Sequence, residues 1–513
     1  MLTIVYNRQE FEYDTYACVT SFFPGIALRQ YFDDVEHKDG NLPEEEKEAP
    51  DTLRIELYPE EGFGMASFIA GEILSKTETY TLDLRASFKE EQKAEEKAIA
   101  FKKVWKRYFY DLMSKDTGIS LPWGSLTGIR PTKLIMTMLR EEETEDKVRD
   151  RLYDEYRVSE EKMDLGIRIA RLEDSILDPF RYKTSADKTT TEGGYSLYIG
   201  IPFCPSTCLY CSFTSFPIAV WQKKVADYLA ALKREMEAAV RIMKGKGPDT
   251  IYIGGGTPTS LSADELQILL ENVREIIPMD GVREFTVEAG RPDSITKDKL
   301  KVMKQMGVGR ISVNPQTMKE ETLRLIGRHH SVDDVRRAFS EAREAGFDNI
   351  NMDTILGLPG ETLDDVKKTF EEIEKMAPDS LTVHSLALKR ASRMKRWVEE
   401  HGAIRGMDYE SAMGYAAKAA GALGMRPYYL YRQKNMAGNL ENTGYATEGK
   451  YGLYNILIME EVQSIVALGV GTVSKRVWPS GRIERCENVK DVTMYLDKID
   501  EMIARKEALF TIN

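Results

Sequence analysis

Three of the five cysteines of this chain lie within eight residues, in the sequence Cys204-Pro-Ser-Thr-Cys208-Leu-Tyr-Cys211. Thiolates this close together on one loop can hold an iron–sulfur cluster, and a four-iron, four-sulfur ([4Fe–4S]) cluster normally binds four of them. Ser212 and Phe213 follow the third cysteine, so the loop itself offers no fourth thiolate. The loop therefore predicts a cluster with one open iron, where a small molecule can bind.

A structural zinc site is the alternative, and it needs a fourth ligand from elsewhere in the chain. His329, His330 and His384 could supply that ligand, so the spacing alone leaves zinc open. Structural zinc more often uses two separated ligand pairs, which favours the cluster. Cys18 and Cys486 are distant in sequence, and we expect them to be buried thiols.

Further motifs surround the cysteine loop, and together they resemble a known family. They are Tyr198-Ile-Gly-Ile-Pro-Phe203, Gly254-Gly255-Gly256-Thr257-Pro, Asn314-Pro-Gln316, Gly327-Arg328-His329-His330 and Asn351-Met-Asp353. The set resembles the radical S-adenosylmethionine (SAM) enzymes, in the branch related to oxygen-independent coproporphyrinogen III oxidase. Outside this core, two more motifs resemble the HemZ-like subgroup, namely Gly124-Ser-Leu-Thr-Gly-Ile-Arg130-Pro-Thr-Lys133 and Arg426-Pro-Tyr-Tyr-Leu-Tyr-Arg432-Gln-Lys434-Asn435.

The resemblance implies two cofactors, a [4Fe–4S] cluster on Cys204, Cys208 and Cys211 and SAM on the open iron. Electron transfer would cleave SAM to a 5′-deoxyadenosyl radical, which takes a hydrogen atom from the substrate. An electron donor such as flavodoxin or ferredoxin is implied as a partner. The implied cofactor-binding residues are Tyr198, Gly254, Gly255, Gly256, Thr257, Glu288, Gln316, Arg328 and Asp353.

The resemblance also implies individual roles, each of which has a structural alternative. Tyr198 would lie near the cluster or the adenine, and Glu288 would bind a ribose or amine group of SAM. Arg328 would pair with a carboxylate and Asp353 with ribose hydroxyls, but Arg328 could instead form a surface ion pair and Asp353 could cap a turn. The glycines would let backbone approach SAM closely, or form an ordinary strand-to-helix turn. His329 and His330 are expected as an exposed pair at a helix end, either structural or proton-donating.

The implied substrate is a tetrapyrrole, most simply coproporphyrinogen III, which would be oxidatively decarboxylated to protoporphyrinogen IX in heme biosynthesis. Arginine or lysine beside aromatic side chains should bind its carboxylates and its apolar face. Arg426, Arg432 and Lys434 alternate with tyrosines and offer both, although the tyrosines could instead pack the C-terminal part onto the barrel. Phe213 stands where oxidases of the family have a fourth cysteine. A heme-binding trafficking protein or chaperone, and a radical SAM enzyme that modifies heme, are therefore alternatives.

Composition limits the other classes of function. The net charge is −12 and no long basic block occurs, which disfavours nucleic acid or an anionic membrane as the main partner. The first residues do not resemble a secretion signal, and no apolar run approaches the length of a membrane span. We therefore expect a cytoplasmic protein without membrane insertion, in a compartment that keeps the three thiols reduced.

The 513 residues are too many for one core and should form two or three domains. A polar Thr-, Ser- and Gly-rich linker at 183–194 predicts a boundary. Before it we expect an α+β domain (1–185) with strands at 53–58 and 80–84 and helices at 92–112, 132–139 and 162–177. We hypothesise that this domain positions the substrate or docks a reductase.

After the linker, strands alternate with helices, which predicts a parallel sheet. We expect strands at 197–201, 250–254, 284–288, 310–313, 349–356 and 380–386, and helices at 222–243, 263–276, 297–306, 332–344 and 363–376. Six units are too few for a closed eight-stranded barrel, so a partial (β/α)6 barrel (190–390) is predicted, as in radical SAM enzymes. A mostly helical domain (391–513), with helices at 409–423 and 489–505, should cover one end. The motifs follow successive strands and should converge at their carboxyl ends.

Overall fold

The structure is a computed structural model, and it describes residues 1–23, 26–32, 49–89, 92–126, 128, 130–141, 144–180, 183–184, 191–192, 194–389, 392–402, 404, 407–433, 436 and 440–511. Contacts divide the chain into two compact units. The N-terminal unit is Met1–Arg168 with Arg432–Glu441, and the large unit is Ile169–Tyr431 with Asn442–Asn513. The domain boundaries expected at 185–190 and 390–391 fall outside the described residues, and the three predicted domains stay a prediction.

The N-terminal unit contains a five-stranded sheet in the order β2-β1-β3-β4-β5. Leu53, Ile55 and Leu57 alternate toward the core of this unit, as the period of a strand requires. On the long helix α2, Phe101, Trp105 and Phe109 recur every four residues and pack into the same core. The strands are β1 (Leu2–Tyr6), β2 (Leu28–Phe32), β3 (Thr52–Tyr58), β4 (Phe63–Ile69) and β5 (Glu78–Asp83).

Five helices accompany this sheet in the chain: α1 (Glu12–Phe22), α2 (Ala94–Thr117), α3 (Pro131–Arg140), α4 (Glu145–Tyr156) and α5 (Glu160–Leu177). The two strands and three helices predicted from the sequence are confirmed here. The sequence analysis did not predict β1, β2 and β4. Of the polar linker, the described residues form the short strands β6 (Lys183–Thr184) and β7 (Thr191–Glu192), which pair with each other.

A buried ion pair holds Glu441 within the N-terminal unit. The carboxylate of Glu441 accepts hydrogen bonds from Trp123 Nε1 at 2.7 Å and from Lys162 Nζ at 2.8 Å. The exposed fractions of the Lys162 and Glu441 side chains are 3% and 0%. Burial lowers the pKa of Lys162, but the charges of Glu441 and Glu161 and their hydrogen bonds together outweigh it and hold the pKa above its ordinary value. A charge removed from water in this way needs its partner.

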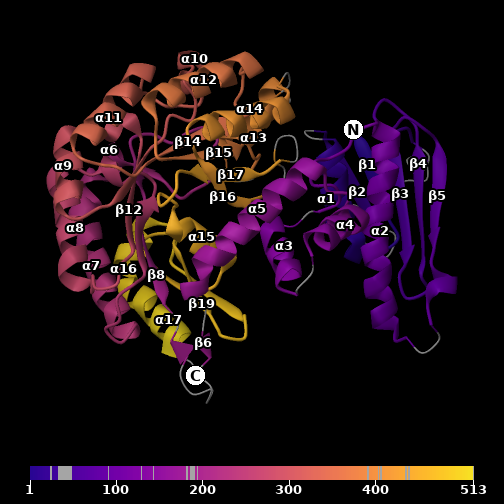
Figure 1. Ribbon diagram of the computed structural model, residues 1–513, viewed down its shortest axis with the longest axis horizontal. Helices are drawn as coiled ribbons and strands as arrows, with labels where there is room; N and C mark the ends of the chain where they lie inside the picture. Colours follow the sequence, from indigo (N-terminus) through magenta and orange to yellow (C-terminus); the bar gives the residue numbers. More distant parts are fainter. Residues whose placement is uncertain are drawn as a thin grey trace. The chain divides into compact units, whose positions relative to one another are not determined.

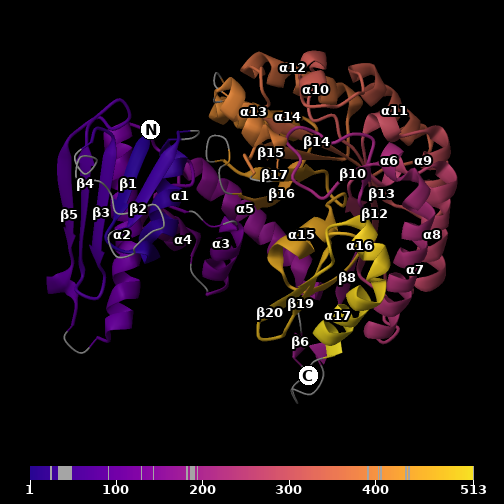
Figure 2. The same ribbon diagram turned by 180° about the vertical axis from the view of Figure 1, so that it is seen from behind.

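The large unit contains an eleven-stranded sheet in the order β16-β17-β15-β14-β13-β12-β11-β8-β18-β19-β20. All six predicted strands are confirmed, and they lie side by side in parallel at its centre. Their helices lie along the outer side of the sheet in both ribbon views (Figure 1, Figure 2). The strands are β8 (Tyr195–Ile201), β11 (Thr250–Gly255), β12 (Glu284–Gly290), β13 (Arg310–Val313), β14 (Ile350–Leu356) and β15 (Ser380–Ser385). This is the partial (β/α)6 arrangement that the sequence predicts.

The helices that follow these strands begin at side-chain caps. Ser262, Ser331 and Thr362 each accept a hydrogen bond from the first turn of their helix, in a capping box. The caps also end the loops that leave the carboxyl ends of the strands. The helices of this region are α6 (Ile218–Trp221), α7 (Val225–Ile242), α8 (Ala263–Ile276), α9 (Lys297–Gln305), α10 (Glu320–Leu325), α11 (Val332–Glu344) and α12 (Leu363–Met376).

The C-terminal part contains helices, as expected, and also five strands that the sequence analysis did not predict. The strands β16 (Arg426–Tyr431) and β17 (Asn442–Ala446) extend the sheet beside β15. On the other side, β18 (Ser464–Leu468) pairs in parallel with β8, and β19 (Val473–Val477) and β20 (Ile483–Glu487) follow. The helices are α13 (Arg393–His401), α14 (Tyr409–Ala422), α15 (Leu453–Glu460), α16 (Val492–Asp497) and α17 (Ile499–Thr511).

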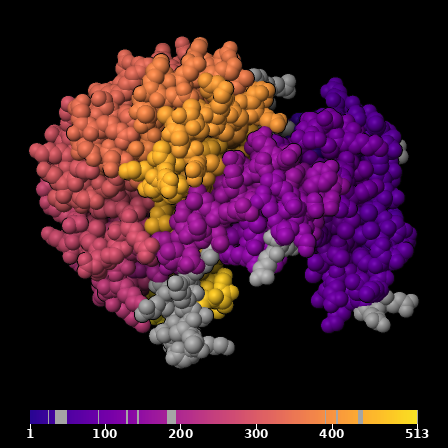
Figure 3. Space-filling model, in the orientation of Figure 1, coloured from indigo at the N-terminus to yellow at the C-terminus, as the bar shows by residue number. Residues whose placement is uncertain are grey.

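These C-terminal residues belong to the large unit. In the space-filling view, yellow C-terminal atoms and orange atoms from near residue 400 meet on one face of it (Figure 3). Strand β18 explains the connection, because it adds a seventh parallel strand next to the strand that leads into the cysteine loop. In the described part of the chain, no helix is long and apolar enough to cross a membrane.

Candidate functional site

The cysteine loop, residues 203–216, leaves the carboxyl end of β8 and closes on itself. Its base is a pair of two-residue strands, β9 (Phe203–Cys204) and β10 (Phe216–Pro217). Cys204 and Cys208 are buried, Cys211 is half-buried, and all three are free thiols. The strand that precedes the loop thus presents all three thiols at one end of the parallel sheet.

Backbone hydrogen bonds hold the loop from two sides. The amide of Leu209 donates to Ile326 O at 2.9 Å, and the carbonyl of Leu209 accepts from the amide of Met394 at 2.9 Å. Ser206 Oγ donates to Gly327 O at 2.9 Å. The loop is therefore fixed against the segment before Arg328 and against the start of α13.

Burial and the neighbouring thiols raise the pKa of two cysteines of the loop. Burial is the main cause that raises the pKa of Cys204 to about 11, and the charges of Cys211 and Cys208 contribute to this rise. Burial also raises the pKa of Cys211, to which Cys208 adds. A metal cluster that binds here would displace these thiol protons, and the three thiolates would share it as ligands.

The described residues include no group of three or more His, Cys, Asp and Glu side chains that could hold a single metal ion. The zinc alternative therefore gains no support from the described geometry. A [4Fe–4S] cluster does not need such a group, because each thiolate binds a different iron atom. Three thiols within eight residues of one loop fit a cluster of this kind.

Three glycines stand at the end of β11, and the last of them packs against the cysteine loop. A Cβ atom on Gly256 would lie 2.6 Å from Phe203 O and 2.9 Å from Cys204 Sγ. Gly255 has a φ of +106°, which favours glycine. A Cβ atom on Gly254 would lie 2.9 Å from Glu288 Oε2. The sequence predicts that these glycines let backbone approach SAM closely; the contacts within the protein already require glycine. Next to them, Thr257 Oγ1 lies 3.5 Å from Cys204 Sγ.

Glu288 lies at the end of β12 beside a stack of three tyrosines. Tyr252 donates a hydrogen bond to Glu288 Oε1. The ring of Tyr252 stacks on Tyr454 at 4.4 Å and on Tyr198 at 6.1 Å, measured between ring centroids. Burial raises the pKa of Glu288 to about 7, and the charge of Asp353 also raises it. Glu288 can therefore exchange a proton near neutral pH.

Asp353, on β14, is held by amides and a histidine. Its two carboxylate oxygens accept hydrogen bonds from Asn314 Nδ2 at 2.9 Å and from Asn351 Nδ2 at 2.7 Å. His384 Nε2 lies 3.8 Å from Asp353 Oδ2. Burial raises the pKa of Asp353, but His384 and the amides outweigh it and hold the pKa below its ordinary value. Asp353 is thus an ionised carboxylate, able to accept hydrogen bonds from hydroxyl groups.

Gln316 has an unusual backbone conformation that ties it to Asp353. Its φ is +67°, in the left-handed region, and its amide donates to Asp353 O at 2.9 Å. Its side-chain oxygen is buried and has no hydrogen-bond partner among the described residues. This conformation costs energy for a residue other than glycine and persists only where surrounding contacts hold it. Such strained residues are common at binding sites.

Arg328 is buried, so the alternative of a surface ion pair is wrong for it. Its Nη1 donates to Asn314 O at 2.5 Å. Burial lowers the pKa of Arg328, but Tyr210 and Cys208 outweigh it and hold the pKa above its ordinary value. Its Nε is buried without a hydrogen-bond partner in the described structure. A fixed cation with an unsatisfied donor beside the thiols fits an anionic ligand.

The expected exposed histidine pair is half wrong, because His329 is exposed but His330 is buried. Burial and the nearby cations Arg328 and Arg291 lower the pKa of His330 to about 3. Neither ring nitrogen has a hydrogen-bond partner within the described ranges. His330 is therefore neutral near pH 7 and does not suit the proton-donating role.

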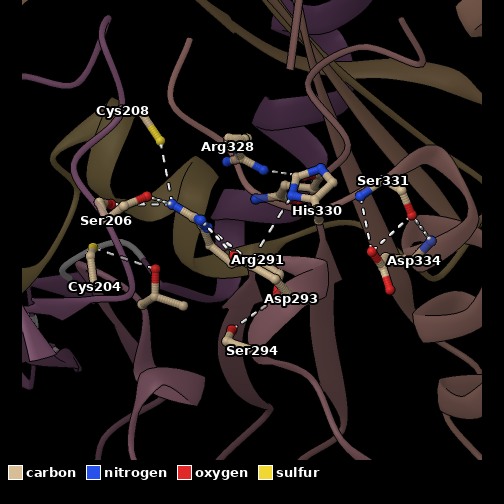
Figure 4. Close-up of polar contacts among 12 residues, drawn as sticks. Cys204, Ser206, Cys208, Arg291, Asp293, Ser294, Arg328, His330, Ser331 and Asp334 are labelled. Atoms are coloured by element: carbon tan, nitrogen blue, oxygen red, sulfur yellow. Dashed lines mark hydrogen bonds and ion pairs between the residues drawn. The ribbon is translucent and has the colours of Figure 1, made fainter. Parts of the chain in front are cut away.

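Sequence reasoning missed Arg291, which lies directly beneath the cysteine loop (Figure 4). Its guanidinium contacts both Ser206 and Cys208 and pairs with Asp293. The sequence Gly290-Arg-Pro-Asp293 follows β12, at the edge where the other site residues gather. That position after a strand is the signal that could have identified it.

Two of the three predicted substrate residues are described, and they belong to different units. Arg426 is exposed on β16, and Lys434 lies outside the described residues. Arg432 is buried in the N-terminal unit, where it donates to Leu126 O. Tyr428 and Tyr429 are buried in the large unit, as the alternative packing role expects. Binding of a tetrapyrrole by Arg426, Arg432 and Lys434 therefore stays a prediction.

The remaining predicted residues form one connected set at the carboxyl ends of the strands. Arg328 interacts with Cys208 and donates a hydrogen bond to Asn314, which in turn donates one to Asp353. The charge of Asp353 raises the pKa of Glu288. Glu288 adjoins Gly254, and Gly256 returns the set to Cys204. The convergence expected from the order of the motifs is therefore present.

Comparison with known proteins places these residues in context. The radical SAM superfamily matches residues 198–373, which include the loop, the glycines, Glu288, Gln316, Arg328 and Asp353. The chain is 40% identical over 423 residues to "Oxygen-independent coproporphyrinogen-III oxidase-like protein HemZ" of Bacillus subtilis, covering 80% of this chain and 83% of that protein. It is 41% identical over 197 residues to "Heme chaperone HemW" of Bacillus subtilis, covering 38% of this chain and 51% of that protein. A solved structure, "Coproporphyrinogen III oxidase (HemN)" from Escherichia coli, aligns at 23% identity and a TM-score of 0.47, over 65% of this chain and 73% of that one.

Proposed function

Because the chain belongs to the radical SAM superfamily and, within it, to the family of HemZ-like coproporphyrinogen-III oxidase-like proteins, we propose that it oxidises coproporphyrinogen III without oxygen. The product would be protoporphyrinogen IX, through oxidative decarboxylation of propionate side chains. The observation that carries the proposal is the cysteine loop packed on Gly256, within one connected set of polar residues.

In this proposal Cys204, Cys208 and Cys211 hold a [4Fe–4S] cluster, and SAM binds at its open iron. When bound, the cluster and SAM together supply the abstraction of a hydrogen atom from an unactivated carbon. Fixed cations beside the loop support this assignment, because thiolates bring negative charge into a buried site. The connected set of residues then has to bind and orient SAM.

The charges of the site residues suit the groups of SAM. The ionised carboxylate of Asp353 accepts hydrogen bonds and so suits ribose hydroxyls. The buried guanidinium of Arg328 suits the SAM carboxylate. Glu288, with a pKa of about 7, can accept a hydrogen bond when ionised or donate one when protonated, which suits an amine or a ribose hydroxyl. Tyr198 would border the adenine through its tyrosine stack.

The substrate part of the proposal is supported by the HemZ relative, whose printed name is that of an oxidase-like protein. Cleavage of SAM would need one electron delivered to the cluster, so we propose an electron-carrier protein such as flavodoxin or ferredoxin as the partner. The free thiols of the loop support a reducing compartment such as the cytoplasm.

A second candidate function is heme binding for transfer to another protein. Two observations favour it: a relative is named a heme chaperone, and Phe213, two residues after Cys211, stands where oxidases of the family have a fourth cysteine. The Phe213 side chain is 69% exposed, and Lys389 Nζ lies 5.6 Å from the centre of its ring. An exposed aromatic ring beside a cation could contact the face and a propionate of heme.

One anaerobic experiment separates the two functions. The full chain is reconstituted with iron and sulfide, supplied with SAM and a reductant, and incubated separately with coproporphyrinogen III and with heme. We expect carbon dioxide, vinyl products and 5′-deoxyadenosine from coproporphyrinogen III. The matched variants are Cys208→Ala, which should abolish all three products, and Cys486→Ala, which removes a thiol outside the loop and should abolish none.

Tight heme binding without substrate-dependent 5′-deoxyadenosine would overturn the oxidase proposal in favour of the chaperone. Consumption of heme together with 5′-deoxyadenosine would instead identify a heme-modifying enzyme.

A further inference from the structure

Arg291 is a buried cation that contacts Ser206 and Cys208 of the cysteine loop. Its side chain is 3% exposed, and it follows Gly290, whose φ of +55° turns the chain at the end of β12. A buried guanidinium is costly unless its hydrogen bonds are made. The hydrogen-bond partners of Arg291 therefore indicate its role.

The guanidinium joins two segments that are distant in sequence. On one side, Nε donates to Asp293 Oδ1 at 3.0 Å and Nη2 donates to Asp293 Oδ2 at 2.6 Å, a bidentate pair. On the other side, Nη1 donates to Ser206 Oγ at 2.9 Å, to Ser206 O at 3.2 Å and to Cys208 Sγ at 3.8 Å. Figure 4 shows the guanidinium between the loop and Asp293.

These contacts differ from those of a residue that binds SAM. Each of the three nitrogens of Arg291 already donates within the protein, whereas Arg328 keeps a buried nitrogen without a partner among the described residues. Arg291 also donates to one of the three thiol sulfurs itself. Arg291 therefore orders the cysteine loop and influences the group that the loop binds.

Its charge has a second consequence for a bound cluster. One-electron reduction adds a negative charge to the cluster, and a fixed cation nearby stabilises that reduced state. Hydrogen bonds to cluster sulfurs and nearby charge are among the factors that set the reduction potential. Arg291 offers both at Cys208, and Asp293 fixes its orientation.

We propose that Arg291 is a positioning residue that orders the cysteine loop and raises the reduction potential of the cluster, and that Asp293 holds it in place. The effect on the potential rests on the proposed cluster, whereas the ordering of the loop does not. The two parts can therefore be tested separately, in the protein without metal and in the reconstituted protein.

The first test measures hydrogen exchange of the loop in the full chain without metal. The amides of Leu209 and Cys211 are hydrogen-bonded to Ile326 O and Cys208 O, so a peptide that covers 203–211 reports the order of the loop. In Arg291→Gln this peptide should exchange about tenfold faster, because charge-assisted hydrogen bonds are lost. Arg310→Gln is the matched control, since Arg310 is also buried in the large unit but bonds to Asn349 and Ser380, and it should leave the peptide unchanged.

The second test measures the reduction potential of the reconstituted cluster by an electron paramagnetic resonance titration. Arg291→Gln should lower the potential and weaken cluster retention about 10- to 100-fold. Arg291→Lys keeps the charge but loses the bidentate geometry, so its potential should stay nearer the wild-type value while its loop exchanges faster. A residue with a merely structural role would change thermal stability without changing the potential.

Unchanged loop exchange and an unchanged potential in a folded Arg291→Gln protein would overturn the proposal. If Arg291→Gln does not fold, Arg291→Lys keeps a cation beside Asp293 but loses the fork of donors. It should still accelerate exchange of the loop, and no acceleration would also overturn the proposal. Altered loop exchange in a protein that never binds a cluster would instead contradict the proposed function and leave the ordering role standing.

Discussion

Replacing Gly256 with alanine should displace the cysteine loop. The added Cβ atom would lie 2.6 Å from Phe203 O, 2.9 Å from Cys204 Sγ and 3.0 Å from Ile201 O. Ordinary contacts between heavy atoms are about 3.5–4.0 Å, so the surroundings must move by roughly 1 Å. Overpacking of this kind costs about 1–3 kcal/mol in the free energy of unfolding. Two of the three atoms belong to backbone, and the third is a thiol sulfur of the loop, so the shift must pass into the loop.

The assay compares this variant with Gly414→Ala. Gly414 lies in α14 of the same unit, and a Cβ atom there would meet no atom within 4 Å. Alanine should stabilise that helix by about 0.5–1 kcal/mol relative to glycine. Thermal unfolding by calorimetry reports stability, and iron and sulfide per chain after anaerobic reconstitution report the cluster. We expect Gly256→Ala to lose stability and most of its iron, and Gly414→Ala to lose neither.

Wild-type iron content and stability in Gly256→Ala would refute the reasoning. That result would mean that the glycine is not needed for the loop to pack against β11.

Three further predictions concern charged residues. Burial raises the pKa of Glu288 to about 7 from 4.5, so the folded protein binds a proton more tightly than the unfolded chain, and stability falls as pH rises from about 4.5 to about 7. Relative to Glu288→Gln, the free energy of unfolding of the wild type should fall by on the order of 1–3 kcal/mol across this window. Denaturation midpoints of the two proteins that change in parallel with pH would contradict this. Lys162→Met removes the cation that pairs with the buried carboxylate of Glu441 and should lower the free energy of unfolding by about 3–5 kcal/mol. In a double-mutant cycle, the double variant Lys162→Met, Glu441→Leu should recover part of this loss. A double variant no more stable than Lys162→Met would argue against the pair. Arg432→Ala should lower stability by about 1–3 kcal/mol and leave the KM for coproporphyrinogen III unchanged, while an effect confined to KM would restore the predicted substrate role.

The parallel strands and their helices could be predicted because each is a local pattern. Strand β8 is a continuous apolar run that becomes buried on both faces, and α8, α11 and α12 begin at a serine or threonine with an acidic residue three positions later. The order of the motifs then placed them at one edge of the sheet. These arguments need no knowledge of contacts between distant residues.

The parts that were missed depend on such distant contacts. Strand β18 is five residues long, and only its pairing with β8 distinguishes it from a buried loop. Arg291 is separated from Cys208 by 83 residues. Arg432 reads as a substrate ligand in sequence, yet residues 432–441 fold into the N-terminal unit. Charge and composition do not reveal which of two units a short segment joins.

The most direct test of the proposed reaction follows a single hydrogen atom. Coproporphyrinogen III carrying deuterium at the propionate carbon next to the ring is incubated anaerobically with the reconstituted full chain, SAM and a reductant, and 5′-deoxyadenosine is analysed by mass spectrometry. The proposed function predicts deuterium in 5′-deoxyadenosine, with one carbon dioxide released for each. Unlabelled 5′-deoxyadenosine, or none, with coproporphyrinogen III left intact would contradict it.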